Sequence, residues 1–221
     1  MLEASPQFLE HYARYAGYPA RSGPLSERMV ELIYVALDAS STHLFASGLK
    51  THMTRALDVG ATQADIFGVL HLVAVQGMSS VCQATAILDE LSHTDALPPI
   101  DETLQSKIDT IGNAHALALT SLAALDPEYV ETALAFIEHG KPVDSLTPAE
   151  SSLIQTALHA CFTAFNPVAL RQTIATALRH NVSPAELRQA IQLGAHLSVH
   201  GTALGATVYQ EISGKDSQAK P

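Results

Sequence analysis

The sequence predicts an all-α protein built from two tandem copies of one helical unit. Apolar residues recur at intervals of three and four along most of the chain, which is the periodicity of an amphipathic helix. No stretch alternates β-branched and polar residues as a half-buried strand does. The chain also aligns with itself, without a gap, when Thr42 is laid over Thr163. Together these observations favour a duplicated helical fold.

The signals that start and end helices repeat with the same offset. Two residues that readily adopt the left-handed conformation at a helix end lie over each other, Gly60 and Asn181. An N-cap followed by an acid three residues later then opens the next helix in both copies, as Thr62 and Asp65 in the first and Ser183 and Glu186 in the second. Matching caps are harder to obtain by chance than matching leucines, so we interpret the alignment as a duplication.

Helices are expected, in order, over 26–39, 49–59, 63–76, 80–91, 104–124, 128–138, 149–162, 168–180, 184–198 and 200–212. The first repeat then covers 1–91 and carries the candidate site, and the second, degenerate repeat covers 126–213. Residues 92–125 form a linker and a connecting helix, because the Pro98-Pro99 pair interrupts the helical pattern. Residues 214–221 are expected to be a flexible tail.

The amino-acid composition and net charge of the chain exclude several classes of function. With 221 residues, 47% hydrophobic and 15% charged, the chain is long and apolar enough to bury a core. A net charge of −10 repels phosphate, so nucleic acid is not an expected partner. The chain has two cysteines, far apart and without a Cys-x-x-Cys, which points to a reducing cytoplasm. We expect no signal peptide and no membrane helix.

Three polar residues of the first repeat form the candidate site: Glu31, His43 and His52. At the equivalent positions the second repeat has Ser152, Ala164 and Thr173. The apolar scaffold therefore survives in the second repeat while all three polar groups are lost. This asymmetry suggests that one repeat keeps a site and the other keeps the fold.

The chemistry of the three residues is that of proton transfer. His43 and His52 converge only if the chain turns between them, and Ser47-Gly48 is a plausible break and N-cap. His52 then shares a helix face with Arg55, three residues later. A carboxylate such as Glu31 fixes the tautomer of a histidine, and the imidazole moves protons near neutral pH.

Other histidines carry weaker signals. His71 follows Phe67 in an apolar helix, where it borders the core or lines a pocket. His196 and His200 have the i,i+4 spacing of metal ligands, but there is no HExxH glutamate between them and no obvious third ligand, so a structural role is favoured. Glu31, His43 and His52 are chemically able to bind zinc or iron, yet their spacing matches no specific motif, and no metal or other cofactor is predicted.

Residues 23–91 resemble the carboxymuconolactone decarboxylase superfamily, which also contains the alkylhydroperoxidase-D-like enzymes. The resemblance rests on Glu31-Leu32-Ile33, on His52 eight residues before Gly60-Ala61-Thr62, and on the following helix to Gly77. Residues 146–212 match the family more weakly. The resemblance implies the alkylhydroperoxidase-D-like fold and assembly into trimers or hexamers. For a tandem chain it implies a homotrimer with six pseudo-equivalent units.

The resemblance also separates two branches of activity. The peroxidase branch uses a Cys-x-x-Cys whose positions are Phe45 and Gly48 in this chain, so thiol peroxidase activity is not expected. The decarboxylase branch needs neither cysteine nor cofactor. By this likeness the substrate is a small carboxylated lactone or an intermediate of aromatic catabolism. His52 is then the proton donor or relay, Glu31 orients it, and His43 and Arg55 hold the negative charge of the substrate, with His71 as a further binding residue.

Two other functions remain open from the sequence. The degenerate second repeat is compatible with a non-catalytic ligand-binding or assembly protein on the same scaffold. A metal-dependent enzyme using Glu31, His43 and His52 is the third alternative. Turnover of a substrate would distinguish the cofactor-independent lyase from the binding protein. Metal analysis of the purified protein would distinguish it from the metal-dependent enzyme.

Overall fold

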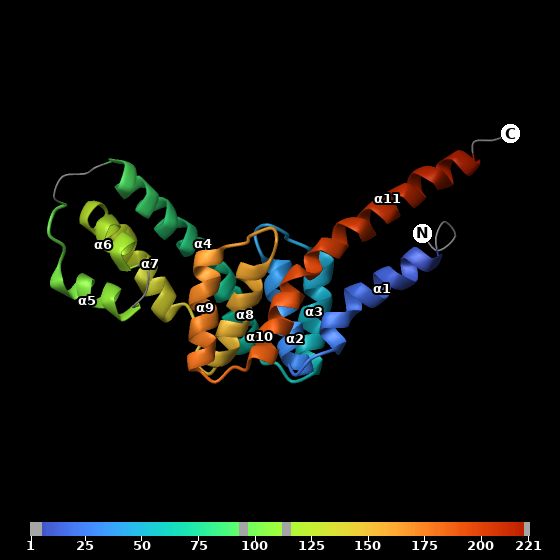
Figure 1. Cartoon of the computed structure of the whole chain (residues 1–221), viewed down its shortest axis with the longest axis horizontal. Helices are drawn as coiled ribbons and strands as arrows, with labels where there is room; N and C mark the ends of the chain where they lie inside the picture. Colours follow the sequence, from blue (N-terminus) through green and yellow to red (C-terminus); the bar gives the residue numbers. More distant parts are fainter. Residues whose placement is uncertain (1–5, 93–96, 112–115, 219–221) are drawn as a thin grey trace. The chain divides into compact units, whose positions relative to one another are not determined.

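The computed structural model describes residues 6–92, 97–111 and 116–218, and within these ranges it is helical with no strand. The chain folds into two compact units. Unit 1 contains α1 (Pro6–Arg21), α2 (Glu27–Ala39), α3 (Ala46–Asp58), α8 (Pro148–Ala160), α9 (Pro167–Arg179), α10 (Pro184–Gly194), the 3₁₀ turn η1 (Ala195–Leu197) and α11 (Ser198–Gln218). Unit 2 contains α4 (Gln63–Ser92), α5 (Glu102–Ile111), α6 (Ala116–Leu125) and α7 (Pro127–His139). The prediction of an all-α fold is confirmed (Figure 1).

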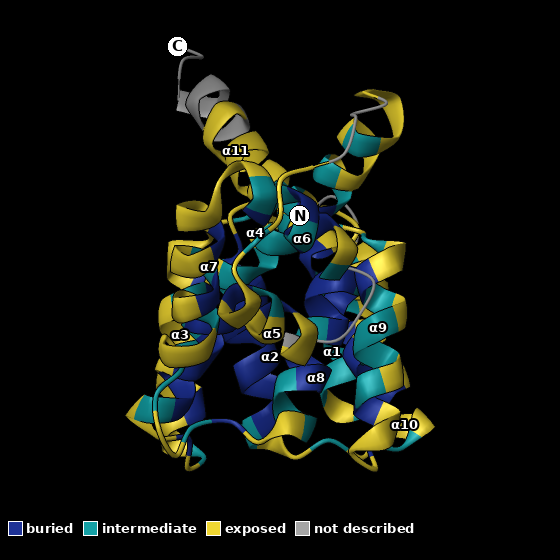
Figure 2. Cartoon of the chain, turned by 90° about the vertical axis from the view of Figure 1, so that its left-hand side faces the viewer, coloured by how far each residue is buried: buried dark blue, intermediate teal, exposed yellow. Residues whose placement is uncertain are grey.

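Helix α2 is the centre of unit 1. Ten consecutive residues, Met29 to Asp38, are buried, and α2 packs against α3, α8 and α10 (Figure 2). The helix begins at Ser26, whose side chain accepts a hydrogen bond from the Met29 N–H. A helix buried on every side is normally apolar all round. The two acids that α2 nevertheless buries, Glu31 and Asp38, therefore require partners.

Two helices of unit 1, α2 and α3, have counterparts of the same length and spacing later in the chain. The bounds of α8 and α9 are those of α2 and α3 shifted by 121 residues, which is also the separation of Thr42 and Thr163, whose hydroxyl groups lie 3.0 Å apart. Gly60 and Asn181 both adopt positive φ, 95° and 62°, after α3 and α9. Thr62 and Ser183 both cap the next helix. These correspondences support the predicted duplication.

The spatial units do not coincide with the predicted repeats. Unit 1 joins residues 1–61 to residues 147–221, whereas unit 2 is the continuous segment 62–146. Two copies of a short amphipathic helix pair bury their apolar faces best against each other, so α2–α3 and α8–α9 form one bundle. Unit 2 has its own core around Cys82, to which α4, α5, α6 and α7 contribute Leu104, Ile108, Ala118, Leu119, Ala123, Val130 and Leu134.

Several helix boundaries differ from those predicted. Residues 6–21 form α1, which the apolar pattern did not indicate; the rings of Phe8, Tyr15 and Tyr18 on it are exposed, and no residue of α1 is fully buried. Residues 63–76 and 80–91 belong to one helix, α4, since Gly77 and the two serines after Met78 do not interrupt it. The helix predicted over 104–124 is two helices, α5 and α6, with 112–115 outside the described residues.

The remaining boundary predictions concern the linker and the tail. Within the linker 92–103, residues 93–96 lie outside the described residues, and α5 begins at Glu102. In the predicted tail, residues 214–218 complete α11, and residues 219–221 lie outside the described part of the chain. Helix α4 is long and apolar enough to cross a membrane by length and composition, with a mean hydropathy of 1.4, but 39% of that window is buried in the fold. One such helix is weak support for a membrane span.

Residues of α10 and α11 hold α1 in place through hydrogen bonds. Gln189, which is almost fully buried, donates a hydrogen bond to the Pro19 carbonyl of α1 and accepts one from the Leu25 N–H. Tyr12 of α1 donates a hydrogen bond to the Val199 carbonyl at 2.9 Å. These bonds fix α1 and the start of α11 within unit 1.

A close approach of α10 to α8 gives a test of this packing. A Cβ at Gly194 would lie 2.5 Å from the Ala157 carbonyl oxygen, whereas a Cβ at Gly205 in α11 would have nothing within 4 Å. We expect Gly194→Ala to lower the free energy of unfolding by about 1–3 kcal/mol, because the backbone of α8 must move. Gly205→Ala is the control and should raise it by up to about 1 kcal/mol through helix propensity. Urea unfolding measures both, and equal effects would show that the close approach is not needed.

Candidate active site

Two buried carboxylates on α2 organise the site. Glu31 is 7% exposed and Asp38 is 2% exposed. They are seven residues apart, which is close to two helical turns and places them on one face. Glu31 lies beside His52, and the histidine nearest to Asp38 is His43. The site therefore consists of two neighbouring carboxylate–histidine pairs.

The first pair joins α2 to α3. His52 Nδ1 lies 2.6 Å from Glu31 Oε2, and both side chains are largely buried. An ionised Glu31 accepts this hydrogen bond, which places the His52 proton on Nδ1 and leaves Nε2 for a ligand. Arg55, one turn further along α3, approaches Glu31 Oε1 at 4.0 Å while most of its side chain remains exposed. The structure therefore brings three predicted residues together.

The connection between α2 and α3 is tight. The chain leaves α2 at Ser40, and the Phe45 N–H donates to the Asp38 carbonyl. Leu44 has a φ of 47°, a left-handed conformation that is costly for a branched side chain. Helix α3 begins at Ala46 with Phe45 as its N-cap residue, so the prediction that Ser47-Gly48 forms the break and cap is wrong by two to three residues. The turn itself displaces His43 from the axis of α3.

Gly48 is needed for a different reason. A Cβ at this position would lie 2.3 Å from Asp38 Oδ2 and 2.4 Å from the Phe45 ring. Asp38 therefore occupies the space that a side chain on the first turn of α3 would take. Glycine is required at position 48 by the close approach of the buried carboxylate and not by the start of the helix.

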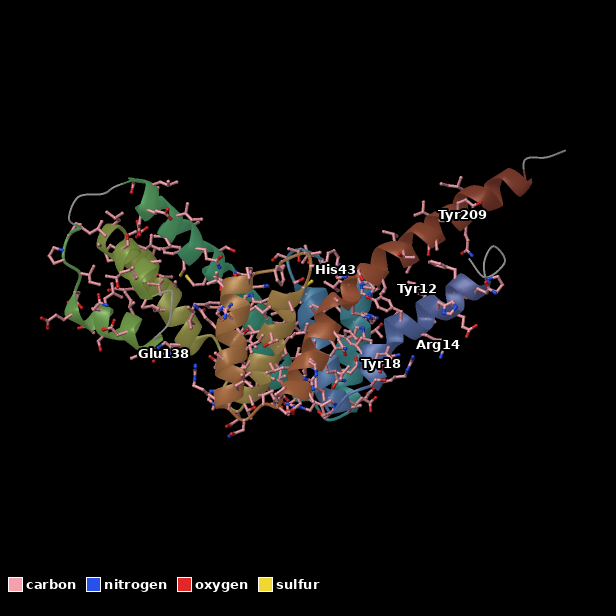
Figure 3. All side chains as sticks on the ribbon, viewed as in Figure 1. Tyr12, Arg14, Tyr18, His43, Glu138 and Tyr209 are labelled. Atoms are coloured by element: carbon pink, nitrogen blue, oxygen red, sulfur yellow. The ribbon has the colours of Figure 1, made fainter. Side chains whose placement is uncertain are left out.

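The second pair forms where the α2–α3 connection meets α11. His43 Nε2 lies 2.8 Å from His200 Nδ1, in hydrogen-bonding distance, and 3.7 Å from Asp38 Oδ1. Figure 3 labels His43 beside the beginning of α11. The Phe45 ring packs against both imidazoles, with centroids 5.5 Å from His43 and 4.7 Å from His200. His43 is thus separated from the His52–Glu31 pair and belongs with Asp38 and His200.

Burial controls the charges in this cluster. It lowers the pKa of His43 and also that of His200, which the neighbouring charges of His43 and His52 lower further. It raises the pKa of Asp38 to about 6, against the opposing effect of His52. Near neutral pH both imidazoles are therefore neutral, and Asp38 changes protonation slightly below this range.

Tyr34 connects the two pairs. Its ring centroid is 4.5 Å from that of His52 and 4.8 Å from that of His196. Burial raises the pKa of the Tyr34 hydroxyl, and the charge of Glu31 raises it further, so Tyr34 is a neutral hydrogen-bonding group. His196 in turn meets His200 edge-on at 5.5 Å.

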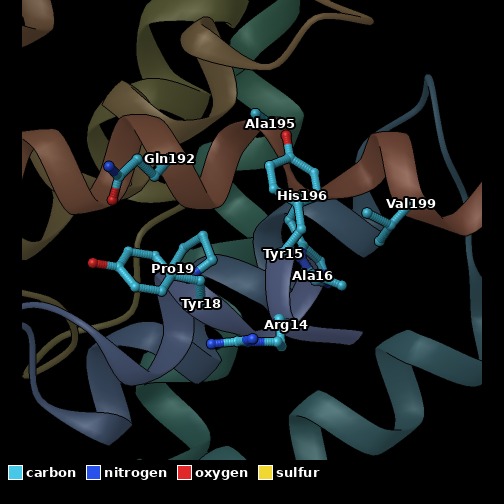
Figure 4. Close-up of a pocket in the computed structure, with 9 residues that line it drawn as sticks. All are labelled: Arg14, Tyr15, Ala16, Tyr18, Pro19, Gln192, Ala195, His196 and Val199. Atoms are coloured by element: carbon cyan, nitrogen blue, oxygen red, sulfur yellow. The ribbon is translucent and has the colours of Figure 1, made fainter. Parts of the chain in front are cut away.

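A cavity of about 350 Å³ adjoins this cluster through His196. Its walls come from α1 and from the segment around η1, as Figure 4 shows. The lining is mostly apolar, with Tyr15, Tyr18, Pro19 and Val199, and Arg14 supplies one cation. Such a volume and lining suit a small ring compound with an anionic group.

Not every predicted residue lies in the site. His71 is in α4 of unit 2, where its Nε2 lies 2.9 Å from the Phe136 carbonyl and its ring packs on that phenylalanine, and none of its contacts involves the residues above. The metal set considered from the sequence is divided between two clusters, because His52 pairs with Glu31 and His43 pairs with His200.

Sequence reasoning missed Tyr34 and Asp38 and gave His196 and His200 a structural role. The signal for Asp38 was present, since an acid seven residues after Glu31 in an otherwise apolar helix marks the same face. Tyr34, one turn after Glu31, lies on that face too. His196 and His200 belong to the predicted second repeat, whose own trio is lost, so this repeat contributes two histidines to the site of the first.

Comparison with known proteins supports the family assignment. Residues 6–90 match the Carboxymuconolactone decarboxylase family, CMD. A solved structure from Burkholderia xenovorans LB400, titled a "putative gamma-carboxymuconolactone decarboxylase subunit", is similar with a TM-score of 0.86 and 27% sequence identity. The similarity covers 97% of this chain and 89% of that one. No curated protein sequence matches this chain.

The half-buried His196 provides a pH test of the site. Burial, followed by the charges of His200 and His52, lowers its pKa from 6.5 to about 4. The folded protein therefore excludes a proton that the unfolded chain binds between these values, so His196 contributes stability above pH 6.5 that is lost as the pH falls to 4. We expect His196→Gln to make the loss of unfolding free energy over this range smaller by roughly 2–3 kcal/mol.

Two measurements check this expectation. Nuclear magnetic resonance should show the His196 ring titrating well below 6.5 in the wild type, and urea unfolding at several pH values should give the stability difference. A His196 signal that titrates at its ordinary value would mean that this ring is solvated.

Proposed function

We propose that this chain, whose residues 6–90 match the Carboxymuconolactone decarboxylase family, is a lyase, or a related proton-transfer enzyme, acting on a small carboxylated lactone or an intermediate of aromatic catabolism. The observation that carries this proposal is the His52–Glu31 hydrogen bond of 2.6 Å in a largely buried setting. It supplies an imidazole of fixed tautomer with one ring nitrogen available to a substrate.

The proposed reaction needs an acid and a cation. Loss of carbon dioxide breaks the bond between the carboxylate carbon and the ring, and the electron pair moves onto the ring as an enolate. Protonated His52 then donates its Nε2 proton to the ring carbon and regains a proton from solvent. Glu31 stabilises the imidazolium before the transfer, since its carboxylate lies against Nδ1.

Arg55 is the proposed binding residue for the substrate carboxylate. Its guanidinium is 4.0 Å from Glu31 and mostly exposed, which leaves donors for a bidentate contact beside His52. His43 is a poor anion binder in this arrangement, because burial keeps its imidazole neutral. The apolar cavity next to His196 is lined by neither His52 nor Arg55, so the reacting ring is assigned to the space at His52 and not to that cavity.

Turnover tests the assignment of His52. The measurement is carbon dioxide release and loss of ultraviolet absorbance with γ-carboxymuconolactone and related lactone and β-keto acids. We expect His52→Gln to lower kcat by about 10²–10⁴-fold, the usual contribution of a positioned acid, and Glu31→Gln to lower it less. Thr173→Ala, at the position in the second repeat that corresponds to His52, is the matched control and should leave turnover unchanged.

Arg55→Ala should raise KM with a smaller effect on kcat, because Arg55 is assigned to binding. Wild-type turnover that survives His52→Gln would exclude His52 as the proton donor. Tight binding of these acids without any turnover would instead identify a ligand-binding protein.

We also propose that the chain forms a homo-oligomer, with a trimer favoured by the family resemblance. Apolar side chains on α11 support an interface there, since Leu204, Val208 and Ile212 are 66%, 44% and 60% exposed. Figure 1 shows α11 extending beyond the other helices of unit 1.

Light scattering after size-exclusion chromatography measures the assembly. We expect a mass three times that of the chain, and a reduction to a smaller species for the double substitution Leu204→Lys and Val208→Lys, because buried lysines are not tolerated at an apolar interface. A monomeric wild type would refute the proposal. The cytoplasmic location stays a prediction from the sequence.

A further inference from the structure

A second cluster of ligand-forming groups lies beside the His52–Glu31 pair and takes no part in the proposed proton transfer. Asp38 from α2, His43 from the α2–α3 connection and His200 from α11 each offer one atom, and these atoms lie within 4.8 Å of one another. The three residues are brought together from distant parts of the chain, and His43 and His200 already lie 2.8 Å apart.

Asp38 lacks the partners that a buried carboxylate requires. It is 2% exposed, its Oδ2 has no hydrogen-bond partner among the described residues, and its Oδ1 has His43 at 3.7 Å. Burying a carboxylate without a hydrogen-bond partner is costly. A bound cation would supply the missing compensation.

The surroundings enclose this carboxylate. Gly48 lets the first turn of α3 approach it closely, because a Cβ on Gly48 would lie 2.3 Å from Asp38 Oδ2. The strained turn at Leu44, with its φ of 47°, presents His43 to His200 on the other side. The Phe45 ring covers both imidazoles. His43 and His200 thus lie on one side of the orphaned carboxylate, and an ion bound there would replace the hydrogen bond between their two ring nitrogens.

We propose that Asp38, His43 and His200 bind a divalent first-row transition-metal ion, with Zn²⁺ as the test ion. Two imidazole nitrogens and one carboxylate oxygen are a donor set that such ions accept. Ligand atoms about 2.0–2.2 Å from one ion lie at most roughly 4 Å apart. The 2.8 Å and 3.7 Å separations at His43 already satisfy this limit. The longest separation lies within 4.8 Å, so the ligand atoms must move closer together when an ion binds.

The role that follows is to hold an anionic ligand close to the first pair. Asp38 and Glu31 lie two turns apart on one face of α2, so an ion at Asp38 would face the same space as His52. Three protein ligands leave a coordination position for a carboxylate oxygen or water. The ion site does not depend on the lyase proposal, because its residues are distinct from His52, Glu31 and Arg55.

Direct binding to untagged protein tests this site. The protein is treated with EDTA, dialysed and titrated calorimetrically with Zn²⁺, and Co²⁺ is used in parallel for its visible ligand-field spectrum. We expect one ion per chain. His200→Ala and Asp38→Asn should weaken Zn²⁺ binding by about 100-fold or more, since disturbing only the support of a ligand already costs roughly 10–100-fold. His180→Ala, an exposed histidine at the end of α9, is the matched control and should bind as the wild type does.

Thermal unfolding keeps the result interpretable if a variant is less stable. Zn²⁺ should raise the Tm of the wild type and of His180→Ala by mass action, but not that of Asp38→Asn. Glu31→Gln locates the ion, because it should leave Zn²⁺ binding unchanged. No binding by the wild type, equal binding by His200→Ala, or loss of binding in Glu31→Gln would each overturn the proposal. Turnover by the EDTA-treated protein is measured separately, so the failure of one proposal does not decide the other.

Discussion

The burial of two carboxylates on one face of α2 is the constraint on which the rest of the site depends. Glu31 and Asp38 are enclosed in the most buried helix of unit 1, where an unpartnered charge costs several kcal/mol. Glu31 is compensated by His52 and Arg55 from α3. Asp38 dictates a glycine at position 48. Charge pairing, as well as the burial of apolar area, therefore stabilises the packing of α3 on α2.

The two predicted repeats differ in what they contribute to this site. The second repeat replaces Glu31 and Asp38 with Ser152 and His159, so α8 buries no carboxylate of this kind. It supplies His196 and His200 instead, at the point where η1 and α11 cross toward α2. If the chain is a duplication, as the sequence predicts, the first repeat contributes the acids and the second contributes two of the bases.

Proton transfer and metal binding would use different properties of histidine on the same face of α2. His52 has a fixed carboxylate partner and an open ring nitrogen, which suits a group that gains and gives up a proton. His43 and His200 lie in an environment that keeps them neutral, which suits lone-pair donation. Tyr34 contacts both His52 and His196, and His196 borders the cavity. The aromatic contacts exclude water from the polar atoms and strengthen their interactions.

The sequence by itself predicted the helical class and the bounds of several helices, because these depend on local periodicity and on capping. It placed His52 and Arg55 on one helix face and proposed Glu31 as the partner of His52, but only the structure brings the two side chains into contact. Gly60 and the Thr62–Asp65 cap were likewise local features. The tertiary structure alone decided that His43 leaves this group for Asp38 and His200, and that His71 lies in the other unit. The His43–His200 contact joins residues 157 positions apart beside the strained turn at Leu44, and the His71–Phe136 contact joins residues 65 positions apart. No periodicity in the sequence records how distant helices cross.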